Sequence, residues 1–409
     1  MFKILTLNTI SPAGLDRLPR DRYEIASEIQ HPDAILVRSH DMHGMDLPET
    51  LKAVGRAGAG VNNIPVDRMS ARGIPVFNAP GANANAVKEL VLAGMLLACR
   101  NICQAWDFAR GLRGDDGAIH TQVEAGKKRF VGYELPGRAL GVIGLGAVGR
   151  LVANMGVSLG MKVLGFDPGI TVEGAWQLSA EVQKARGTDE LVSKVDFLSV
   201  HVPLVDSTRH LINADRLRSM RKGVVILNFS RDGIVDDAAA LAAIDAGKVR
   251  AYVCDFPGPL LQGHERVIAL PHLGASTEEA EANCAVMVAE QVREYLEHGN
   301  VTNAVNFPEV TMSRGEGYRI AIVNSNVPNM VGQFSTAMAQ AGLNILDMLN
   351  KSRGPLAYTL ADVDQPISQA VIDRIAGIDG VLAVRVPDAG AATPANGAGG
   401  GEGAASDEG

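Results

Sequence analysis

A glycine-rich turn between an apolar strand and a helix is the feature that most constrains how this chain folds. The strand Leu140–Ile143 leads directly into Gly144–Gly149, and the residues that follow fit a helix. In such a turn Gly144 permits the tight bend, Gly146 lets the backbone approach a pyrophosphate, and Gly149 lets helix and strand pack closely. The free N–H groups at the start of the helix attract phosphate. The sequence therefore predicts a dinucleotide-binding Rossmann unit.

An acidic residue at the end of the next apolar run indicates which dinucleotide binds. Asp167 ends the run 162–167 and lies 18 residues after Gly149. A carboxylate there can accept hydrogen bonds from both ribose hydroxyls and would repel a 2′-phosphate. We expect NAD as the cofactor in preference to NADP. The alternative is a Rossmann-like core that has lost its ligand.

Short apolar runs alternate with helical or turn stretches in two parts of the chain, residues 1–80 and 140–270. This alternation predicts two α/β units with parallel sheets, the second doubly wound. Residues 84–103 predict a long helix with apolar residues on most faces, which we expect to pack between domains or subunits. Residues 278–298 predict a further long helix.

The C-terminal third shows a different pattern. Residues 301–316 are expected to form a linker, and 317–387 follow a β-α-β-β-α-β order that predicts a ferredoxin-like domain. The tail 388–409 consists almost entirely of Ala, Gly, Asp, Glu, Ser and Pro, so we expect it to be disordered.

Charge and apolar content exclude several classes of protein. The formal net charge of −8 argues against a nucleic-acid binder. The longest apolar run, Leu90–Cys99, is about half of a membrane span, and the N-terminus does not resemble a signal peptide. We expect a cytoplasmic protein that does not bind membranes. The four cysteines lack paired metal-ligand spacing, so we expect buried thiols and no metal site.

Two further segments place polar groups after strands of the second sheet, where doubly wound folds bind ligands. Arg231 follows the apolar run 223–228, and His272 follows the run 267–270. A guanidinium can hold a carboxylate in a fork, and an imidazole can accept a proton near neutral pH. Alone, Arg231 suits a surface ion pair and His272 a helix cap or core position. Together they suit hydride transfer to or from a hydroxy acid.

The chain resembles the D-isomer-specific 2-hydroxyacid dehydrogenases. The resemblance is carried by the glycine turn, Asp167, the stretch NFSRDGIVD at 228–236 and the stretch PHLGAST at 271–277. It covers nearly all of residues 1–310 and favours the branch that acts on phosphorylated acids. It implies a flavodoxin-like substrate domain, into which the Rossmann NAD-binding domain is inserted, with the active site between them.

The resemblance also implies domain limits and an activity. The substrate domain would comprise residues 1–95 and 271–300, and the NAD domain 96–270. The reaction would be NAD-dependent oxidation of D-3-phosphoglycerate to 3-phosphohydroxypyruvate, the first step of the phosphorylated route to L-serine. Residues 317–387 resemble an ACT domain, and we expect a homodimer or homotetramer.

Site residues follow by position in the family. Arg231 would orient the substrate carboxylate, and His272 would accept the hydroxyl proton. The substrate's phosphate and carboxylate would be held by Arg38, Ser39, Arg56, Gly58, Ala59, Gly60 and Val61. NAD would contact Gly144, Gly146, Ala147, Val148, Gly149, Asp167, Val202, Pro203, Phe229, Ser230, Cys254, Asp255, Leu273, Gly274 and Ala275.

One departure from the family pattern concerns the partner of the catalytic histidine. The family has an Asp followed five residues later by a Glu that hydrogen-bonds the histidine. Here Cys254 or Asp255 fills the Asp position, and no Glu fills the other. We assign Asp255 to the nicotinamide or to orientation of His272.

The ACT resemblance leaves two roles open. Asn326 and Asn344 match asparagines that bind serine in such domains, while Asn324 stands where a histidine is usual. The domain would either bind serine between paired copies and regulate the enzyme, or serve only in oligomerisation.

Two rival functions remain at this point. One is another dehydrogenase of the family, acting on glyoxylate, hydroxypyruvate or an erythronate phosphate. The other is a non-enzymatic NAD-responsive binding protein. The presence of both Arg231 and His272 argues against a pure sensor, which needs no proton carrier.

Overall fold

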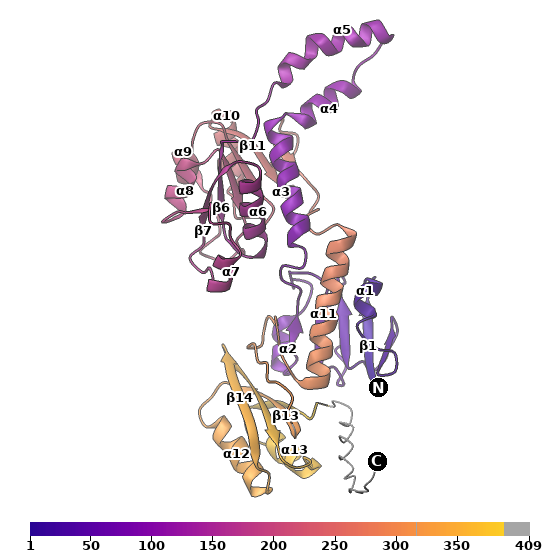
Figure 1. Cartoon of the computed structure of the whole chain (residues 1–409). Coiled ribbons are helices and arrows are strands. Elements are labelled where there is room, and N and C mark those ends of the chain that lie inside the picture. Colours follow the sequence, from indigo (N-terminus) through magenta and orange to yellow (C-terminus); the bar gives the residue numbers. More distant parts are fainter. Residues whose placement is uncertain (316, 388–409) are drawn as a thin grey trace, which may run out of the picture.

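Three sheets follow one another along the long axis of an elongated molecule (Figure 1). The computed structural model describes residues 1–315 and 317–387. The tail 388–409, which we expect to be disordered, lies outside the described residues. Two sheets are parallel and the third is antiparallel, which confirms the predicted fold class.

The first sheet is parallel with the order β2-β1-β3-β4-β5, the flavodoxin-like order. Its elements are β1 (Phe2–Leu7), α1 (Pro12–Leu15), β2 (Tyr23–Ala26), β3 (Ala34–Val37), β4 (Ala53–Arg56), α2 (Val66–Ala71) and β5 (Val76–Phe77). The long helix α11 (Glu278–His298) packs closely on this sheet. A Cβ on Gly55 would lie only 2.8 Å from Val288 and 2.9 Å from Val292 of α11, so a glycine permits the close packing.

The second sheet is parallel with the order β12-β11-β10-β9-β6-β7-β8, a Rossmann order extended by one strand. Its elements are β6 (Ala139–Ile143), α6 (Ala147–Ser158), β7 (Lys162–Phe166), α7 (Val172–Trp176), β8 (Gln183–Lys184), α8 (Thr188–Lys194), β9 (Phe197–Val200), α9 (Ala214–Ser219), β10 (Val224–Asn228), α10 (Asp237–Asp245), β11 (Val249–Cys254) and β12 (Val267–Ala269). Its core strands are buried along their whole length, as expected for strands covered on both faces.

Helix α3 (Ala84–Cys99) packs on the second sheet, with Val91 and Met95 in one buried cluster with Leu140 and Val142. Val87, Val91 and Met95 of this cluster fall in the range 84–95, which the sequence assigned to the first domain. The chain crosses between the sheets just before α3 and returns through the segment between β12 and α11 (Figure 1).

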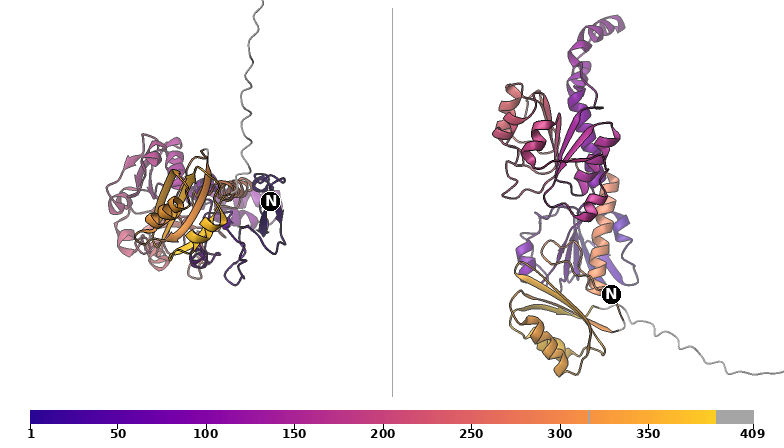
Figure 2. Two further views of the ribbon diagram at one scale, coloured as in Figure 1. Left: turned by 90° about the horizontal axis from the view of Figure 1, so that it is seen from below. Right: turned by 60° about the vertical axis from the view of Figure 1, so that its left-hand side comes forward.

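The predicted helix 84–103 is interrupted. Helix α3 ends at Cys99, and Asn101 adopts a left-handed conformation with φ of 50°. A new helix then begins, and α4 (Ile102–Arg110), α5 (Asp116–Gly126) and the 3-10 helix η1 (Lys127–Phe130) form an arm that projects from the molecule (Figures 1 and 2). No residue of α4 is buried.

The third sheet is antiparallel with the order β14-β15-β13-β16, which confirms the β-α-β-β-α-β prediction. Its elements are β13 (Tyr318–Ser325), α12 (Met330–Gln340), β14 (Ile345–Arg353), β15 (Leu356–Val363), α13 (Gln369–Ala376) and β16 (Val381–Arg385). One face of the sheet packs on the first domain. Tyr358 contacts the rings of Tyr295 and Phe307, and its hydroxyl donates to the Gly299 carbonyl at 2.6 Å.

The segment expected to be a linker packs against the first domain. Val301, Phe307 and Val310 are buried in the core of that domain. The Asn306 side chain accepts a hydrogen bond from the backbone N–H of Val76 at 2.8 Å. A pattern of scattered apolar residues without periodicity does not reveal this packing.

A buried arginine ties the third sheet to the first domain. Arg319 forms a two-pronged ion pair with Asp362, with both N–O distances 2.7 Å. Its remaining N–H groups donate to the carbonyls of His298, Met312 and Ser313. The guanidinium therefore joins a carboxylate of the third sheet to carbonyls at the end of α11 and in the segment before β13.

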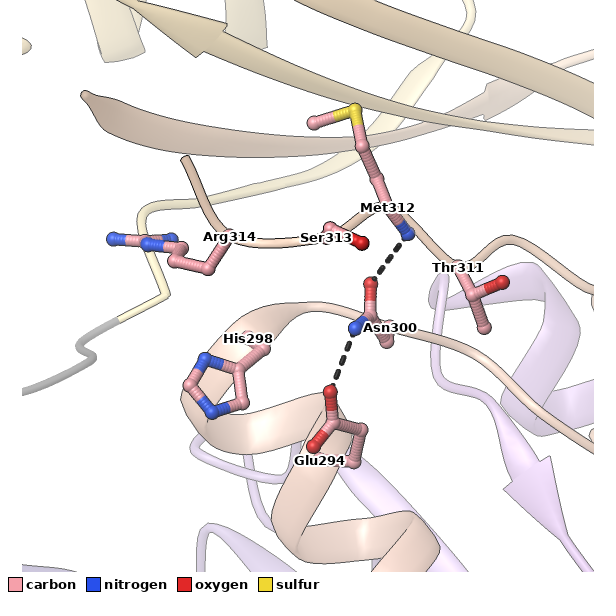
Figure 3. A pocket seen from close by; sticks show the side chains of 7 residues that line it. All are labelled: Glu294, His298, Asn300, Thr311, Met312, Ser313 and Arg314. Atoms are coloured by element: carbon pink, nitrogen blue, oxygen red, sulfur yellow. Dashed lines mark hydrogen bonds between the residues drawn. The ribbon is translucent and has the colours of Figure 1, made fainter. Parts of the chain in front are cut away.

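A polar pocket of about 420 Å³ lies at this junction (Figure 3). The Asn300 side chain crosses it, donating to Glu294 at 2.6 Å and accepting from the backbone N–H of Met312 at 3.0 Å. These contacts hold the end of α11 against the chain that leads to β13. Among the described residues, no helix has both the length and the apolar content to cross a membrane.

Candidate active site

The glycine turn between β6 and α6 has the geometry that the sequence predicts. Gly144 has a φ of 86°, and a Cβ there would collide with the His201 carbonyl. A Cβ on Gly149 would collide with the Gly144 carbonyl, so helix and strand approach as closely as the backbone permits. Nothing lies within 4 Å of the position of a Cβ on Gly146. The start of α6 is therefore open to a pyrophosphate.

Asp167 lies directly after β7, and its carboxylate braces this turn. One oxygen accepts a hydrogen bond from the backbone N–H of Leu145 and the other from that of Gly169, both at 2.8 Å. Each carboxylate oxygen can accept further bonds, which suits two ribose hydroxyls. The residues present therefore fit an NAD molecule.

The loop after β10 is held by the side chain of Asn228. Its amide donates to the Arg231 carbonyl at 3.0 Å, and its oxygen accepts from the Ser230 backbone N–H at 3.2 Å. The Ser230 hydroxyl donates to the Val202 carbonyl, which follows β9. Phe229 points back to α3, where a Cβ on Gly94 would lie 3.0 Å from its ring. These contacts fix the backbone that carries Arg231.

The loop after β12 is held by Asp255, which follows β11 and is 1% exposed. The two carboxylate oxygens accept hydrogen bonds from the backbone N–H groups of Leu273 and Gly274, at 2.7 and 2.8 Å. His272 adopts a left-handed φ of 56°, and its ring packs edge-on against Phe256 with centroids 5.2 Å apart. The carboxylate therefore positions the loop through its backbone.

In these contacts Asp255 holds the backbone of the His272 loop and not the ring of His272. The sequence placed its carboxylate on the nicotinamide or on the ring of His272. In residues 1–315 and 317–387 no carboxylate hydrogen-bonds that ring, and both Asp255 oxygens face backbone N–H groups. The preceding Cys254 is buried, and burial raises the pKa of its thiol to about 11.

Arg231 and His272 lie at the same edge of one sheet, because β10, β11 and β12 are neighbours and parallel. The remaining residues expected to contact the cofactor lie at the start of α6, in the loop after β9 or in the loop after β12: Ala147, Val148, Pro203 and Ala275. The first domain meets this edge at the start of α6, where a Cβ on Gly81 would lie 2.8 Å from Ala147.

Arginines from both domains lie close together where the first domain meets this edge of the second sheet. Arg56 ends β4, and its Nε donates to the side chain of Asn63 at 3.0 Å. Burial, and then the positive charges of Arg231 and Arg38, lower the pKa of Arg56. A Cβ on Gly60 would lie 3.9 Å from an Nη of Arg231. The structure thus brings the predicted substrate arginines of the first domain to the predicted catalytic arginine of the second.

Small residues make room for this cluster. A Cβ on Gly58 would collide with the Arg56 guanidinium. Asn78 donates a hydrogen bond to the Ala59 carbonyl, which holds the loop that continues to Val61. Ser39 follows Arg38, and its backbone N–H donates to the side chain of Asn8 at 3.3 Å.

Sequence reasoning missed the roles of two supporting residues. Asn63 braces Arg56 and also donates to the His40 carbonyl at 2.7 Å. Glu281, in the first turn of α11, forms an ion pair with Arg38. A polar residue in the turn after Arg56 was a usable signal for Asn63. No local signal pairs Arg38 with a residue 243 positions away.

The three asparagines of the C-terminal domain do not come together within one chain. Asn326 follows β13 and lies near Gly354, whereas Asn344 precedes β14 and contacts Asp364. The strand register places these two points at opposite ends of the sheet. Asn324 is buried and donates to the Ser325 carbonyl. A site that uses both Asn326 and Asn344 would need two copies of the chain.

Comparison with known proteins identifies the family. Residues 92–274 match the model of the D-isomer specific 2-hydroxyacid dehydrogenase, NAD binding domain. The chain is 32% identical over 349 residues to the D-3-phosphoglycerate dehydrogenase of Haemophilus influenzae, covering 82% of this chain and 81% of that protein. It is 38% identical over 301 residues to that of Methanocaldococcus jannaschii, covering 71% of this chain but only 55% of the relative.

Solved structures show the same fold. A D-2-hydroxyisocaproate dehydrogenase matches with a TM-score of 0.59 at 21% identity, over 75% of this chain and all of that one. The D-mandelate dehydrogenase of Rhodotorula graminis matches with a TM-score of 0.63 at 21% identity, over 76% of this chain and 99% of that one. In the described residues no group of three His, Cys, Asp or Glu side chains is placed to hold a metal. With its NAD-binding domain and these relatives, the chain belongs to the family of D-isomer-specific 2-hydroxyacid dehydrogenases.

Proposed function

We propose that this protein oxidises D-3-phosphoglycerate to 3-phosphohydroxypyruvate with NAD. The observation that carries this proposal is the convergence of Arg38, Arg56 and Arg231 from two domains. A plain 2-hydroxy acid carries one carboxylate, which one guanidinium can hold in a fork. A phosphorylated acid carries a second, stronger anion, and the two additional arginines suit it.

Each polar group of the site has a role in this reaction. Arg231 binds the substrate carboxylate and polarises the oxygen on C2, while Arg38 and Arg56 hold the phosphate. His272 accepts the proton of the C2 hydroxyl as a general base. When bound, NAD accepts the hydride that leaves C2. Asp255 keeps the His272 loop in place through the N–H groups of Leu273 and Gly274.

Several of the curated relatives that the chain matches are D-3-phosphoglycerate dehydrogenases, which supports the choice of substrate. The chain covers 81% of the Haemophilus influenzae relative and 69% of the Synechocystis relative. The arginine cluster adds a physical reason for a phosphorylated substrate.

The test offers purified protein and NAD a panel of acids and follows NADH formation. The panel contains D-3-phosphoglycerate, D-glycerate, D-lactate, glycolate and 4-phosphoerythronate. D-glycerate is the matched control, because it differs from D-3-phosphoglycerate only by the phosphate. We expect kcat/KM for D-3-phosphoglycerate to exceed that for D-glycerate by at least about 100-fold, since two charge-assisted contacts are lost without the phosphate.

Other results would overturn the assignment. Preference for lactate or glycolate would identify another dehydrogenase of the family. Preference for 4-phosphoerythronate would retain the phosphate site but change the substrate. Binding of NAD without oxidation of any acid would indicate a sensor.

A further inference from the structure

The carboxylate of Glu281 lies beside the arginines of the candidate active site and pairs with one of them, Arg38. Glu281 lies in the first turn of α11, four residues after the N-cap Thr277. Its Oε1 pairs with an Nη of Arg38, which directly follows β3. The pair therefore joins the end of β3 to the start of α11, the helix that packs on the first sheet and follows the His272 loop in the chain.

The three arginines differ in their partners. Arg56 donates to the neutral side chain of Asn63, and Arg231 donates to the Ser230 carbonyl at 2.7 Å. Of the three, within the residues that the structure describes, Arg38 alone pairs with a carboxylate. The side chains of Arg38 and Glu281 are 39% and 40% exposed, so a ligand from solvent can reach the pair.

The same face of α11 continues toward the other arginines. Cys284 lies one turn after Glu281, is buried, and is near enough to Arg56 and Arg38 for both charges to lower the pKa of its thiol, although burial raises it more. Helix α11 therefore forms a wall of the arginine cluster, with Glu281 at its exposed end.

A carboxylate and a phosphate compete for a guanidinium, because both bind it through two oxygens in a plane. We propose that Glu281 is an internal counter-ion of Arg38 that the phosphate of the substrate displaces, and that this exchange sets the affinity of the site for phosphorylated acids. This inference rests on the proposed function. When phosphate binds Arg38, the Glu281 carboxylate turns into the surrounding water, which its exposure permits.

The exchange has opposite effects on substrate binding and on product release. It weakens substrate binding, because the ion pair has to open first. It also speeds release of the phosphorylated product, because Glu281 returns to Arg38. A merely structural pair would instead stabilise the position of Arg38, and its loss would weaken binding.

The test compares Glu281→Gln with Glu278→Gln, each in the otherwise unchanged protein. Both substitutions remove one negative charge from the first turn of α11, but the exposed Glu278 makes no ion pair with Arg38. We expect Glu281→Gln to lower KM for D-3-phosphoglycerate about three- to tenfold, the range of a half-exposed ion pair. KM for D-glycerate should not change, and Glu278→Gln should resemble the parent for both acids.

A binding measurement separates this inference from the proposed function. Titration calorimetry with inorganic phosphate needs no turnover, so it tests competition for Arg38 even if another acid is the substrate. Glu281→Gln should bind phosphate about three- to tenfold more tightly than the parent. Addition of Arg38→Gln to Glu281→Gln should abolish this gain. Unchanged or weaker phosphate binding in Glu281→Gln, or an equal gain in Glu278→Gln, overturns the inference.

Discussion

Replacement of Asp255 by asparagine tests how the catalytic loop is held. The carboxylate is 1% exposed and accepts hydrogen bonds from the backbone N–H groups of Leu273 and Gly274, at 2.7 and 2.8 Å. An asparagine side chain has nearly the same size but only one acceptor oxygen. Its NH2 group would face a backbone N–H, so one buried donor would lose its partner.

The size of the effect follows from these contacts. A hydrogen bond to a charged group contributes about 1.5–3 kcal/mol, and a buried donor without a partner costs about 1–3 kcal/mol. The lost hydrogen bond and the unpaired donor partly describe the same free-energy change, so the two values are not simply added. We expect Asp255→Asn to lower the free energy of unfolding by about 2–4 kcal/mol. The loop carries His272, and a displacement of about 1 Å at a catalytic group can cost about 100-fold in rate.

Two measurements check this prediction. Urea unfolding should show the loss of stability, and kcat should fall about 10- to 100-fold. The pH at which kcat is half-maximal should stay near that of the parent, because the carboxylate acts through the backbone. Asp245→Asn, at a pair with His264 on the surface, serves as the control and should leave both readouts unchanged. A shifted pH profile with unchanged stability would refute the reasoning, since it would mean direct contact between Asp255 and the His272 ring.

Three further predictions concern other parts of the structure. Gly58→Ala places a methyl group where the Arg56 guanidinium lies, so KM for the phosphorylated substrate should rise about tenfold with little change in urea unfolding. Burial lowers the pKa of His201 to about 4, so the free energy of unfolding should fall by about 1–3 kcal/mol as the pH drops from about 6.5 to 4. The unfolded chain takes up that proton and the native chain does not, so urea unfolding of His201→Gln should lack this slope; an identical slope would contradict the argument. Trp106 on the projecting arm is 60% exposed, and if the arm pairs two copies of the chain, Trp106→Glu should convert a dimer to a monomer in analytical ultracentrifugation, whereas an unchanged mass would exclude this role.

The sheet architecture could be predicted from the sequence because its signals are local. Gly144 and Gly149 occupy positions where a Cβ collides with backbone, so no other residue fits and the turn is recognisable. The apolar runs of the second sheet correspond to strands that are buried along their length. The C-terminal order could be read in the same way, since its six elements follow one another as β-α-β-β-α-β along the chain.

The end of α3 could not be predicted from apolar content. Residues up to Cys103 continue the apolar pattern, but the left-handed Asn101 ends the helix and starts the arm. Asparagine tolerates this conformation better than most residues, so Asn101 was a weak signal. The burial of Val301 and Phe307 depends on a surface built from distant segments, which no local pattern reveals.

Sequence motifs name the candidate site residues but not the contacts that hold them in place. Arg38, Arg56, Arg231 and His272 could be named from motifs. Which groups hold them depends on contacts between distant segments of the chain, since Glu281 contacts Arg38 across 243 positions of sequence. The backbone contacts of Asp255 could not be predicted either, because only the folded loop shows that its oxygens face backbone N–H groups.

The most direct test of the account is the substrate preference of Arg56→Met. The measurement is the ratio of kcat/KM for D-3-phosphoglycerate to that for D-glycerate, in the parent and in the variant. If arginines of the first domain hold the phosphate, the parent ratio should be at least about 100, and the variant ratio should fall at least tenfold while activity on D-glycerate remains. An equal ratio in the two proteins would contradict the claim that this cluster recognises a phosphorylated acid.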